Sequence, residues 1–561
     1  MPPGRPSGRP LVPAPLARGA RGAVVAPHHL ATTAGLAMLR AGGHAVDAAI
    51  ATNAVLGVVM PFGCGLGGDG FWLIWHAADR ELVALNGSGR SGAWADPAGL
   101  RAEGMTTLPL HGPLTITVPG AVRSWGDAHA RFGRVPREVL LAPAIELARD
   151  GFAAWDGLIA AIERTAMIVD AELAPRTATA FRSVYRSTGR MWREGERIRL
   201  PALAATLDHL AQEGFDDFYD GELAGRQAMG FAAAGVPLKA GDLATHTSTW
   251  TRPISTDYRG VRVATHPPNS SGIVALELLN ILGAFRAPGR SAFGPAGIED
   301  PRWVHLGIEA SKLAMADRDA HLTDPAAVDI PVDRLTSRTR AAELARRIDP
   351  AWSAAAPAST APRGGGTIFL ATVDAEGNAV ALIQSNYMGF GSGIVDPETG
   401  IHYQNRGSYF SLDPDHPNVL APGKRTLHTL LPWMLFQTGA PGPWIVGGSM
   451  GGDAQPQIAA QVISALVDGR VDVASAVAAP RWFVEPLEHF TPPIDVRLEP
   501  RFAPPIAADL AAKGHPVTLV EPFDSMMGHC HAIELVHGGP GQGGSVAAAT
   551  DPRSAGLPAV W

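Results

Sequence analysis

A run of glycines leads directly into Thr367 in the segment APRGGGTIFLATVDAEGNAV, residues 361–380. The alternation after Thr367 and the turn-forming residues 374–378 predict a loop, a strand, a turn and a second strand. A β-branched Thr is an ordinary residue with which to open a strand. The chemical alternative is cleavage between Gly366 and Thr367. The hydroxyl would then be a nucleophile, and the freed α-amine, with a pKa of about 7.7 to 8.0, would be its general base.

A second glycine-rich segment, VGGSMGGDAQPQIAAQV, spans residues 446–462. Its pattern predicts the end of a strand, a tight turn and the start of a helix, with Asp453 as a helix cap. Adjacent glycines at a helix N-terminus also expose backbone N–H groups, which can form an oxyanion hole at Gly451 and Gly452. A phosphate cradle is a further alternative, although the spacing matches neither the dinucleotide-binding nor the P-loop pattern.

Two arginines could recognise a carboxylate. Arg406 lies among polar residues in YQNRGSYFSL, and Arg90 lies in NGSGRSG. The guanidinium fork matches a carboxylate with two parallel hydrogen bonds. The alternative for both is an ordinary surface arginine, and Arg90 fits that alternative better.

The sequence offers weak grounds for a metal site. His529 and His531 flank Cys530, but this i, i+2 pair has no third ligand nearby in the chain. The only cysteines are Cys64 and Cys530, which exclude a cysteine-based zinc site and favour two buried thiols. We expect neither a metal nor a cofactor.

Mostly helical segments precede the Thr367 region. Two helices separated by Gly42-Gly43 are predicted in residues 28–60, and further helices are predicted to end near Gly151 and Gly214. Ser270 and Ser271 are expected to cap a helix, and residues 303–325 are expected to form a long helix. Beyond Thr367 strands and turns dominate, with helices predicted from about 455 to 467 and 504 to 513.

The composition shift and a low-complexity hinge, residues 348–366, place a boundary at residue 366. We expect a disordered lead-in (1–22), a large chain (23–366) and a small chain (367–561) that together form one globular unit. The formal charge of −7 and the scattered Lys and Arg residues argue against nucleic acid as a partner. The Pro- and Gly-rich start argues against a secretion signal, and no apolar run is long enough for a membrane span. A cytoplasmic location is therefore expected.

Together these segments resemble the γ-glutamyltransferase family of N-terminal-nucleophile hydrolases. The similarity covers nearly the whole chain, through PFGCGLGGDGFWLI, TVPGAVRSWGDAHARFG, LAPAIELARDGF, PPNSSG, EASKLAMADRDAHLTDP and TDPRS in that order. The resemblance implies a four-layer α/β/β/α sandwich that cleaves itself into two chains. It also implies that Thr367 is the nucleophile, that the Ser385 hydroxyl orients it, and that Gly451 and Gly452 form the oxyanion hole.

Several positions depart from the glutamyl-transferring members. Arg406 and Tyr409 stand where those members carry a Gln and an acidic residue for the substrate's amino group, and His428-Thr429 replace a serine pair for its carboxylate. Tyr387 and Arg90 complete the set of substrate-binding residues that we expect. The segment 416–426 leaves no room for a lid loop, so an open site is expected.

These variants are closer to the lidless subgroup that includes oxamate amidohydrolase. The expected function is hydrolysis or transfer of a γ-glutamyl or similar carboxylate-bearing acyl group from a small-molecule amide. The alternatives are an oxamate-type amidohydrolase and an unprocessed binding protein without catalysis. The sequence leaves open whether the protein forms a homodimer.

Overall fold

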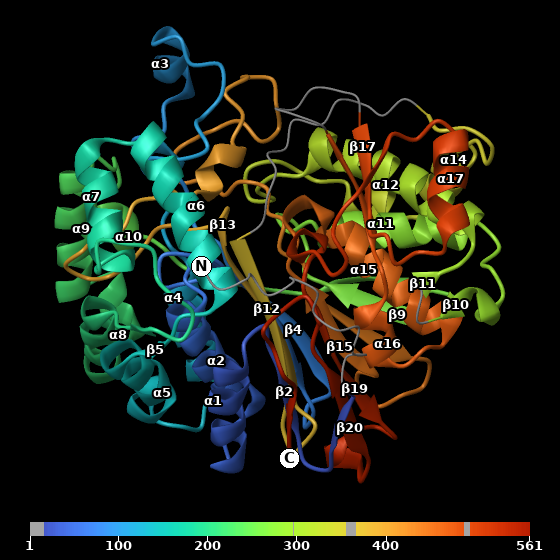
Figure 1. Ribbon diagram of the computed structural model, residues 1–561, viewed down its shortest axis with the longest axis horizontal. Coiled ribbons are helices and arrows are strands. Elements are labelled where there is room, and N and C mark those ends of the chain that lie inside the picture. The colour runs from blue at the N-terminus through green and yellow to red at the C-terminus, as the bar shows by residue number, and fades with distance from the viewer. Residues whose placement is uncertain (1–15, 295–296, 355–365, 487–493) are drawn as a thin grey trace, which may run out of the picture.

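The computed structural model describes residues 16–294, 297–354, 366–486 and 494–561. Two seven-stranded antiparallel sheets lie face to face at the centre of the molecule, with a layer of helices outside each sheet (Figure 1). This arrangement confirms the four-layer α/β/β/α sandwich. The lead-in expected over 1–22 lies mostly outside the described residues, but Ala17–Gly19 already forms a strand.

The first sheet contains the predicted strand that opens near Thr367. In spatial order its strands are β21 (Ala559–Val560), β2 (Ala23–Val25), β12 (Gly366–Val373), β13 (Ala379–Tyr387), β3 (Asp69–His76), β4 (Glu81–Gly87) and β7 (Thr249–Thr251).

The second sheet packs on the first. In spatial order its strands are β1 (Ala17–Gly19), β20 (Ser545–Ala549), β19 (Cys530–Val536), β15 (Ile445–Ser449), β14 (Trp433–Gln437), β9 (Val261–Thr265) and β8 (Ile254–Tyr258). Both sheets therefore mix strands from before and after residue 366.

Helices from the first half of the chain cover the first sheet, on the left of Figure 1. These are α1 (His29–Arg40), α2 (Ala45–Val59), α4 (Ala121–Phe132), α5 (Arg137–Asp150), α6 (Asp156–Glu172), α7 (Pro175–Tyr185), α8 (Pro201–Glu213), α9 (Glu222–Ala234) and α10 (Ala240–Ala244), while α3 (Pro97–Ala102) stands apart. Every residue of α2 is buried, so this helix is an internal part of the layer.

The helices over the second sheet come from both sides of residue 366. They are α11 (Gly272–Gly283), α12 (Pro301–His321), α13 (Val332–Leu335), α14 (Arg338–Ala345), α15 (Gln455–Ser464), α16 (Val473–Ala478) and α17 (Pro504–Ala512). A small sheet of β16 (Trp482–Pro486), β17 (Ile494–Leu498) and β18 (Val517–Leu519) and the pairs β5 (Phe152–Ala153)/β6 (Arg197–Ile198) and β10 (Phe293–Gly294)/β11 (Gly297–Ile298) complete the fold.

Alternation along β12 decides which way Thr367 faces. Ile368 and Leu370 pack into the helix layer, whereas Phe369 and Ala371 pack between the two sheets. Side chains alternate between the faces of a strand, so Thr367 faces the second sheet. The chemistry expected at this residue therefore lies at one end of the sheet–sheet interface.

The helices predicted from the sequence are confirmed, including the break at Gly42-Gly43 and the helix ends at Gly151 and Gly214, which both have positive φ. Ser271 is the N-cap residue of α11, but its hydroxyl makes no capping bond and donates to the carbonyl of His428. Ser270 instead accepts the N–H of Gly272, 3.0 Å away.

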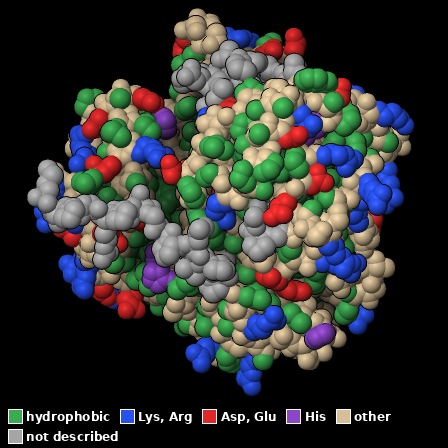
Figure 2. All heavy atoms as spheres, turned by 45° about the vertical axis from the view of Figure 1, so that its right-hand side comes forward, with side chains coloured by type: hydrophobic (Ala, Val, Ile, Leu, Met, Phe, Trp, Pro, Cys, Tyr) green, Lys and Arg blue, Asp and Glu red, His purple; other side chains and the backbone are tan. Residues whose placement is uncertain are grey.

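Acidic and basic side chains are interspersed over the face shown in Figure 2. No helix among the described residues is both long and apolar enough to cross a bilayer.

Candidate active site

Three adjacent strands bring one row of polar side chains together. Thr367 on β12 lies opposite Ser385 on β13, and Ser385 lies opposite Asp69 on β3. Residues directly opposite each other in an antiparallel pair project from the same face of the sheet. The row therefore combines residues that are far apart in the chain: Asp69 lies 298 positions before Thr367, and Ser385 lies 18 positions after it.

Ser385 contacts both sides of the peptide bond that was predicted to be cut. Its Oγ lies 2.9 Å from Thr367 Oγ1 and donates to the Gly366 carbonyl oxygen at 2.8 Å. The Tyr387 N–H donates to the same Oγ at 2.8 Å. Because the single Ser385 proton serves the Gly366 carbonyl, the Thr367 hydroxyl is the donor in the contact between the two hydroxyls.

The strand register is irregular at this bond. A shift between Gly366 and Thr367 interrupts the pairing with β13, and Tyr387 opposite Gly366 has a φ of 76°. A side chain at position 366 would place its Cβ 2.5 Å from the Phe62 carbonyl oxygen. Only glycine therefore fits here, and the strained backbone lies beside the candidate scissile bond.

Arg406 is buried beside this row, which excludes the surface alternative. Its side chain donates to Thr429 Oγ1 at 3.3 Å and to Ser385 Oγ at 3.4 Å, and its guanidinium lies over the ring of Tyr387. Arg406 is 1% exposed, and burial lowers the pKa of its guanidinium. It forms no ion pair with a carboxylate of the described residues. A buried cation without an anion is costly, so this arrangement suits an anionic ligand.

Tyr409 uses its phenol within the protein. The hydroxyl donates to the Asp453 carboxylate, with the two oxygens 2.9 and 2.8 Å away, and Arg318 from α12 forms an ion pair with the same carboxylate. This geometry favours a role for the Tyr409 hydroxyl within the protein over the predicted direct contact with substrate. Asp453 does not cap its helix through a side-chain bond, contrary to the simple interpretation of the sequence.

The glycine turn follows β15, which packs on β12. A Cβ at Gly448 would lie 2.4 Å from the ring of Phe369, two residues from Thr367. The chain then turns through Gly451 and Gly452, with φ of 150° and 53°, before α15 begins. Neither glycine donates its backbone N–H to an atom of the described residues. These donors are available to a developing negative charge.

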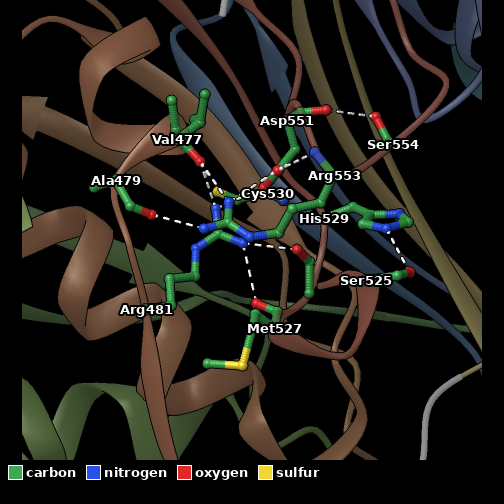
Figure 3. A network of polar contacts seen from close by, with 12 residues as sticks. Val477, Ala479, Arg481, Ser525, Met527, His529, Cys530, Asp551, Arg553 and Ser554 are labelled. Atoms are coloured by element: carbon green, nitrogen blue, oxygen red, sulfur yellow. Dashed lines mark hydrogen bonds and ion pairs between the residues drawn. The ribbon is translucent and has the colours of Figure 1, made fainter. Parts of the chain in front are cut away.

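A buried ionic network of Arg481, Asp551 and Arg553 lies next to the segment that hydrogen-bonds to the start of the turn (Figure 3). Arg481 donates to the carbonyl oxygens of Met527 and Gly528 at 3.1 and 2.7 Å and pairs with Asp551 at 2.6 Å. Asp551 also pairs with Arg553, from the TDPRS segment. The next carbonyl along the chain, that of His529, accepts the N–H of Met450. The network thereby fixes the residue that precedes Gly451.

The family profile described as gamma-glutamyltranspeptidase matches residues 31–561. The chain belongs to this family. It is 38% identical over 544 residues to the glutathione hydrolase-like YwrD proenzyme of Bacillus subtilis, covering 96% of this chain and 98% of that protein. It is also 38% identical over 553 residues to the oxamate amidohydrolase proenzyme of Klebsiella pneumoniae, with 96% and 98% coverage.

The fold agrees with a solved relative over its full length. The crystal structure of cephalosporin acylase from Bacillus halodurans matches with a TM-score of 0.89 and 36% identity, covering 99% of both chains. Membership in the gamma-glutamyltranspeptidase family makes this chain a hydrolase with an amidohydrolase or acyltransferase activity. The alternative of a binding protein without catalysis is not supported.

Asp69 is the residue of this site that sequence reasoning missed. It accepts the Gly89 N–H at 2.9 Å and lies 3.2 Å from His428 Nε2. Burial raises the pKa of Asp69 to about 7, and burial lowers the pKa of His428. His428 Nδ1 is buried without a partner among the described residues. Asp69 could have been found only through strand register, because it is 298 positions from Thr367.

Not every predicted residue joins the cluster. Arg90 donates to the Thr247 carbonyl at 3.1 Å and forms no hydrogen bond or ion pair with the other predicted site residues. Thr367 is 4% exposed in the uncleaved chain, and the open site expected for the cleaved protein stays a prediction.

The predicted buried thiols, Cys64 and Cys530, are confirmed as free and buried. His531 Nδ1 accepts the N–H of Asp551, so it hydrogen-bonds to the same network as Arg481 and Arg553. Among the described residues, one group could hold a metal ion: His305, Glu309 and His515. The Lys312 ammonium already lies 2.6 Å from the Glu309 carboxylate, which favours a closed structural network over a metal site.

Proposed function

We propose that this family member cleaves itself between Gly366 and Thr367. The Thr367 hydroxyl attacks the Gly366 carbonyl carbon, the carbon–nitrogen bond breaks, and the acyl group moves to the oxygen as an ester. The hydroxyl proton passes to the departing nitrogen, which becomes the free α-amine of Thr367. Water then hydrolyses the ester, which leaves a carboxylate on Gly366 and restores the Thr367 hydroxyl. The contact that supports this step is the Ser385 hydroxyl on the Gly366 carbonyl oxygen at 2.8 Å, where negative charge develops during the attack.

After cleavage, the same hydroxyl acts on an external amide. The freed α-amine of Thr367 accepts the hydroxyl proton as the oxygen attacks the substrate carbonyl. The N–H groups of Gly451 and Gly452 hold the oxyanion, and the departing amine takes the proton. Water in a second attack releases the acid and completes hydrolysis, while an amine in its place gives acyl transfer.

Arg406 defines the class of acyl group. The observation that carries this proposal is a fully buried guanidinium with hydroxyl and aromatic neighbours but no carboxylate partner among the described residues. A substrate carboxylate would neutralise it through charge-assisted hydrogen bonds. We therefore favour a carboxylate-bearing amide, such as a γ-glutamyl or glutaryl compound. A cytoplasmic location stays a prediction from the sequence.

Processing is tested by denaturing electrophoresis and by sequencing the N-terminus of the smaller product. The 58.6 kDa mass, divided in proportion to residues 1–366 and 367–561, gives bands of about 38 and about 20 kDa. The smaller product should begin with Thr367. A single full-length band after long incubation would contradict self-cleavage.

Substrate class is tested on Arg406→Met with glutaryl and γ-glutamyl anilides. Loss of a carboxylate contact should raise KM steeply for both anilides and leave an uncharged acyl anilide nearly unaffected. The matched control is Arg262→Met, since Arg262 also stacks on an aromatic ring but lies on β9 against Phe436. An equal effect of the two variants, or no change in KM for Arg406→Met, would contradict the carboxylate clamp.

An oxamate-type amidohydrolase is the alternative function. It is supported by the same buried Arg406 guanidinium, because oxamate also bears a carboxylate beside an amide. Ammonia release from oxamate, glutamine and glutathione by the processed protein separates the alternatives. A strong preference for oxamate would identify a small-amide hydrolase. A strong wild-type preference for γ-glutamyl over glutaryl anilide would require an acidic group for the substrate ammonium.

A further inference from the structure

Asp453 joins the glycine turn to two distant parts of the chain. It directly follows Gly452, and its carboxylate accepts the Tyr409 hydroxyl and pairs with the Arg318 guanidinium. Arg318 lies on α12, before the proposed cleavage site, and its side chain is 1% exposed. The turn therefore has side-chain partners from both sides of residue 366.

The backbone of this turn has little intrinsic preference for one conformation. Gly451 and Gly452 both have positive φ, which glycine reaches without a steric penalty but also leaves easily. Their two N–H groups must nevertheless point at one place if they are to hold an oxyanion. Contacts from other residues must therefore fix the orientation of these two N–H groups.

Both ends of the turn are held. On the upstream side, the N–H of Met450 is fixed by the His529 carbonyl. On the downstream side, the backbone of Asp453 is held through its carboxylate, which contacts the Tyr409 hydroxyl and the Arg318 guanidinium. Movement of Asp453 would rotate the peptide group that carries the Gly452 N–H.

We propose that Arg318 and Tyr409 are positioning residues that hold Asp453, and through it aim the Gly451 and Gly452 N–H groups at the oxyanion. This inference rests on the proposed function, because it assumes that the two glycines form the oxyanion hole. It assigns the Tyr409 hydroxyl to the turn and not to the substrate. It also makes the oxyanion hole dependent on a residue of the large chain.

Tyr409→Phe tests this inference, because it removes only the hydroxyl. A misplaced oxyanion donor weakens binding of the transition state and not of the ground state. We expect kcat to fall by about tenfold to a hundredfold with KM unchanged. The measurement uses the anilide that wild type hydrolyses fastest, with rates normalised to the amount of cleaved small chain.

Tyr258→Phe is the matched control. Tyr258 donates to Asp468 at 2.6 Å, and Arg259 pairs with that same carboxylate at 2.6 Å, which repeats the Tyr–Asp–Arg arrangement on β8 away from the row. Loss of this hydroxyl should lower the melting temperature by an amount similar to that for Tyr409→Phe and leave kcat unchanged.

Three outcomes would overturn the inference: a raised KM with unchanged kcat, which indicates direct substrate contact; an unchanged kcat and KM; or an equal fall in kcat for the control. If Tyr409→Phe does not fold, Asp453→Asn is measured in the same way, and its kcat should fall with KM unchanged. Turnover by Thr367→Ala would instead contradict the proposed function itself, so the two failures are distinguishable.

Discussion

In the proposed mechanism Thr367 supplies the nucleophile and, after cleavage, the general base, so a single substitution would remove both. Thr367→Ala should give a folded, uncleaved and inactive chain, whereas Thr367→Ser should still process, more slowly. Electrophoresis and circular dichroism check this. Thr372→Ala is the control, because Thr372 lies on the same strand but donates to Ala45 in the helix layer. Normal cleavage of Thr367→Ala would place the nucleophile elsewhere.

Ser385 acts on both the hydroxyl and the carbonyl of the proposed cleavage site. Removal of its buried hydroxyl should raise the activation free energy by about 1–3 kcal/mol. Ser385→Ala should therefore slow self-cleavage and turnover by roughly tenfold to a hundredfold while the fold is retained. Unchanged rates would leave Ser385 an ordinary strand residue.

Asp69 predicts a pH dependence of stability. Burial raises its pKa from 3.8 to about 7. Between these two pKa values, the Asp69 carboxyl is deprotonated in the unfolded chain but still protonated in the folded chain. The raised pKa therefore contributes to the free energy of unfolding below about pH 4, and this contribution is lost as the pH rises through about 7. The melting temperature of Asp69→Asn relative to wild type should therefore rise between pH 4.5 and 7.5, which are roughly the limits of this window. A constant difference would contradict the raised pKa.

At the scale of elements, the contact between β15 and β12 depends on a missing side chain. Gly448→Ala would push the new Cβ into the Phe369 ring and separate the sheets near Thr367. Overpacking of this kind costs about 1–3 kcal/mol. Gly225→Ala in α9 is the control, because its Cβ would meet nothing within 4 Å. Chemical denaturation of both variants measures the difference, and equal stabilities would contradict close packing at Gly448.

At the scale of the whole molecule, cleavage at residue 366 would not release a domain. In the first sheet β12 and β13 lie between β2 and β3, and in the second sheet β14 pairs with β9. Sheet hydrogen bonds therefore join the proposed chains throughout. The two chains should elute together from a sizing column and separate only in denaturant. Dissociation under native conditions would contradict this interleaving.

Much of the local structure could be predicted from the chain. Apolar periodicity and glycine positions located α1, α2, α5 and α8, and alternation located β12 and β13. The partner of the Ser271 hydroxyl at the start of α11 was not predictable, because that hydroxyl donates to a carbonyl 157 positions away. The boundaries 23–366 and 367–561 stay predictions until the chain is shown to be cleaved.

The sequence by itself determined the fold class, the glycine-flanked Thr367 and the ordered motifs of the family, since these depend on local pattern and on residue type. Only the tertiary structure decided that Arg406 is buried, that Asp69 joins the row and that Tyr409 contacts Asp453. The physical reason is that these properties depend on strand register and layer packing. Both bring together residues far apart in the chain, and no local pattern records which partners will meet.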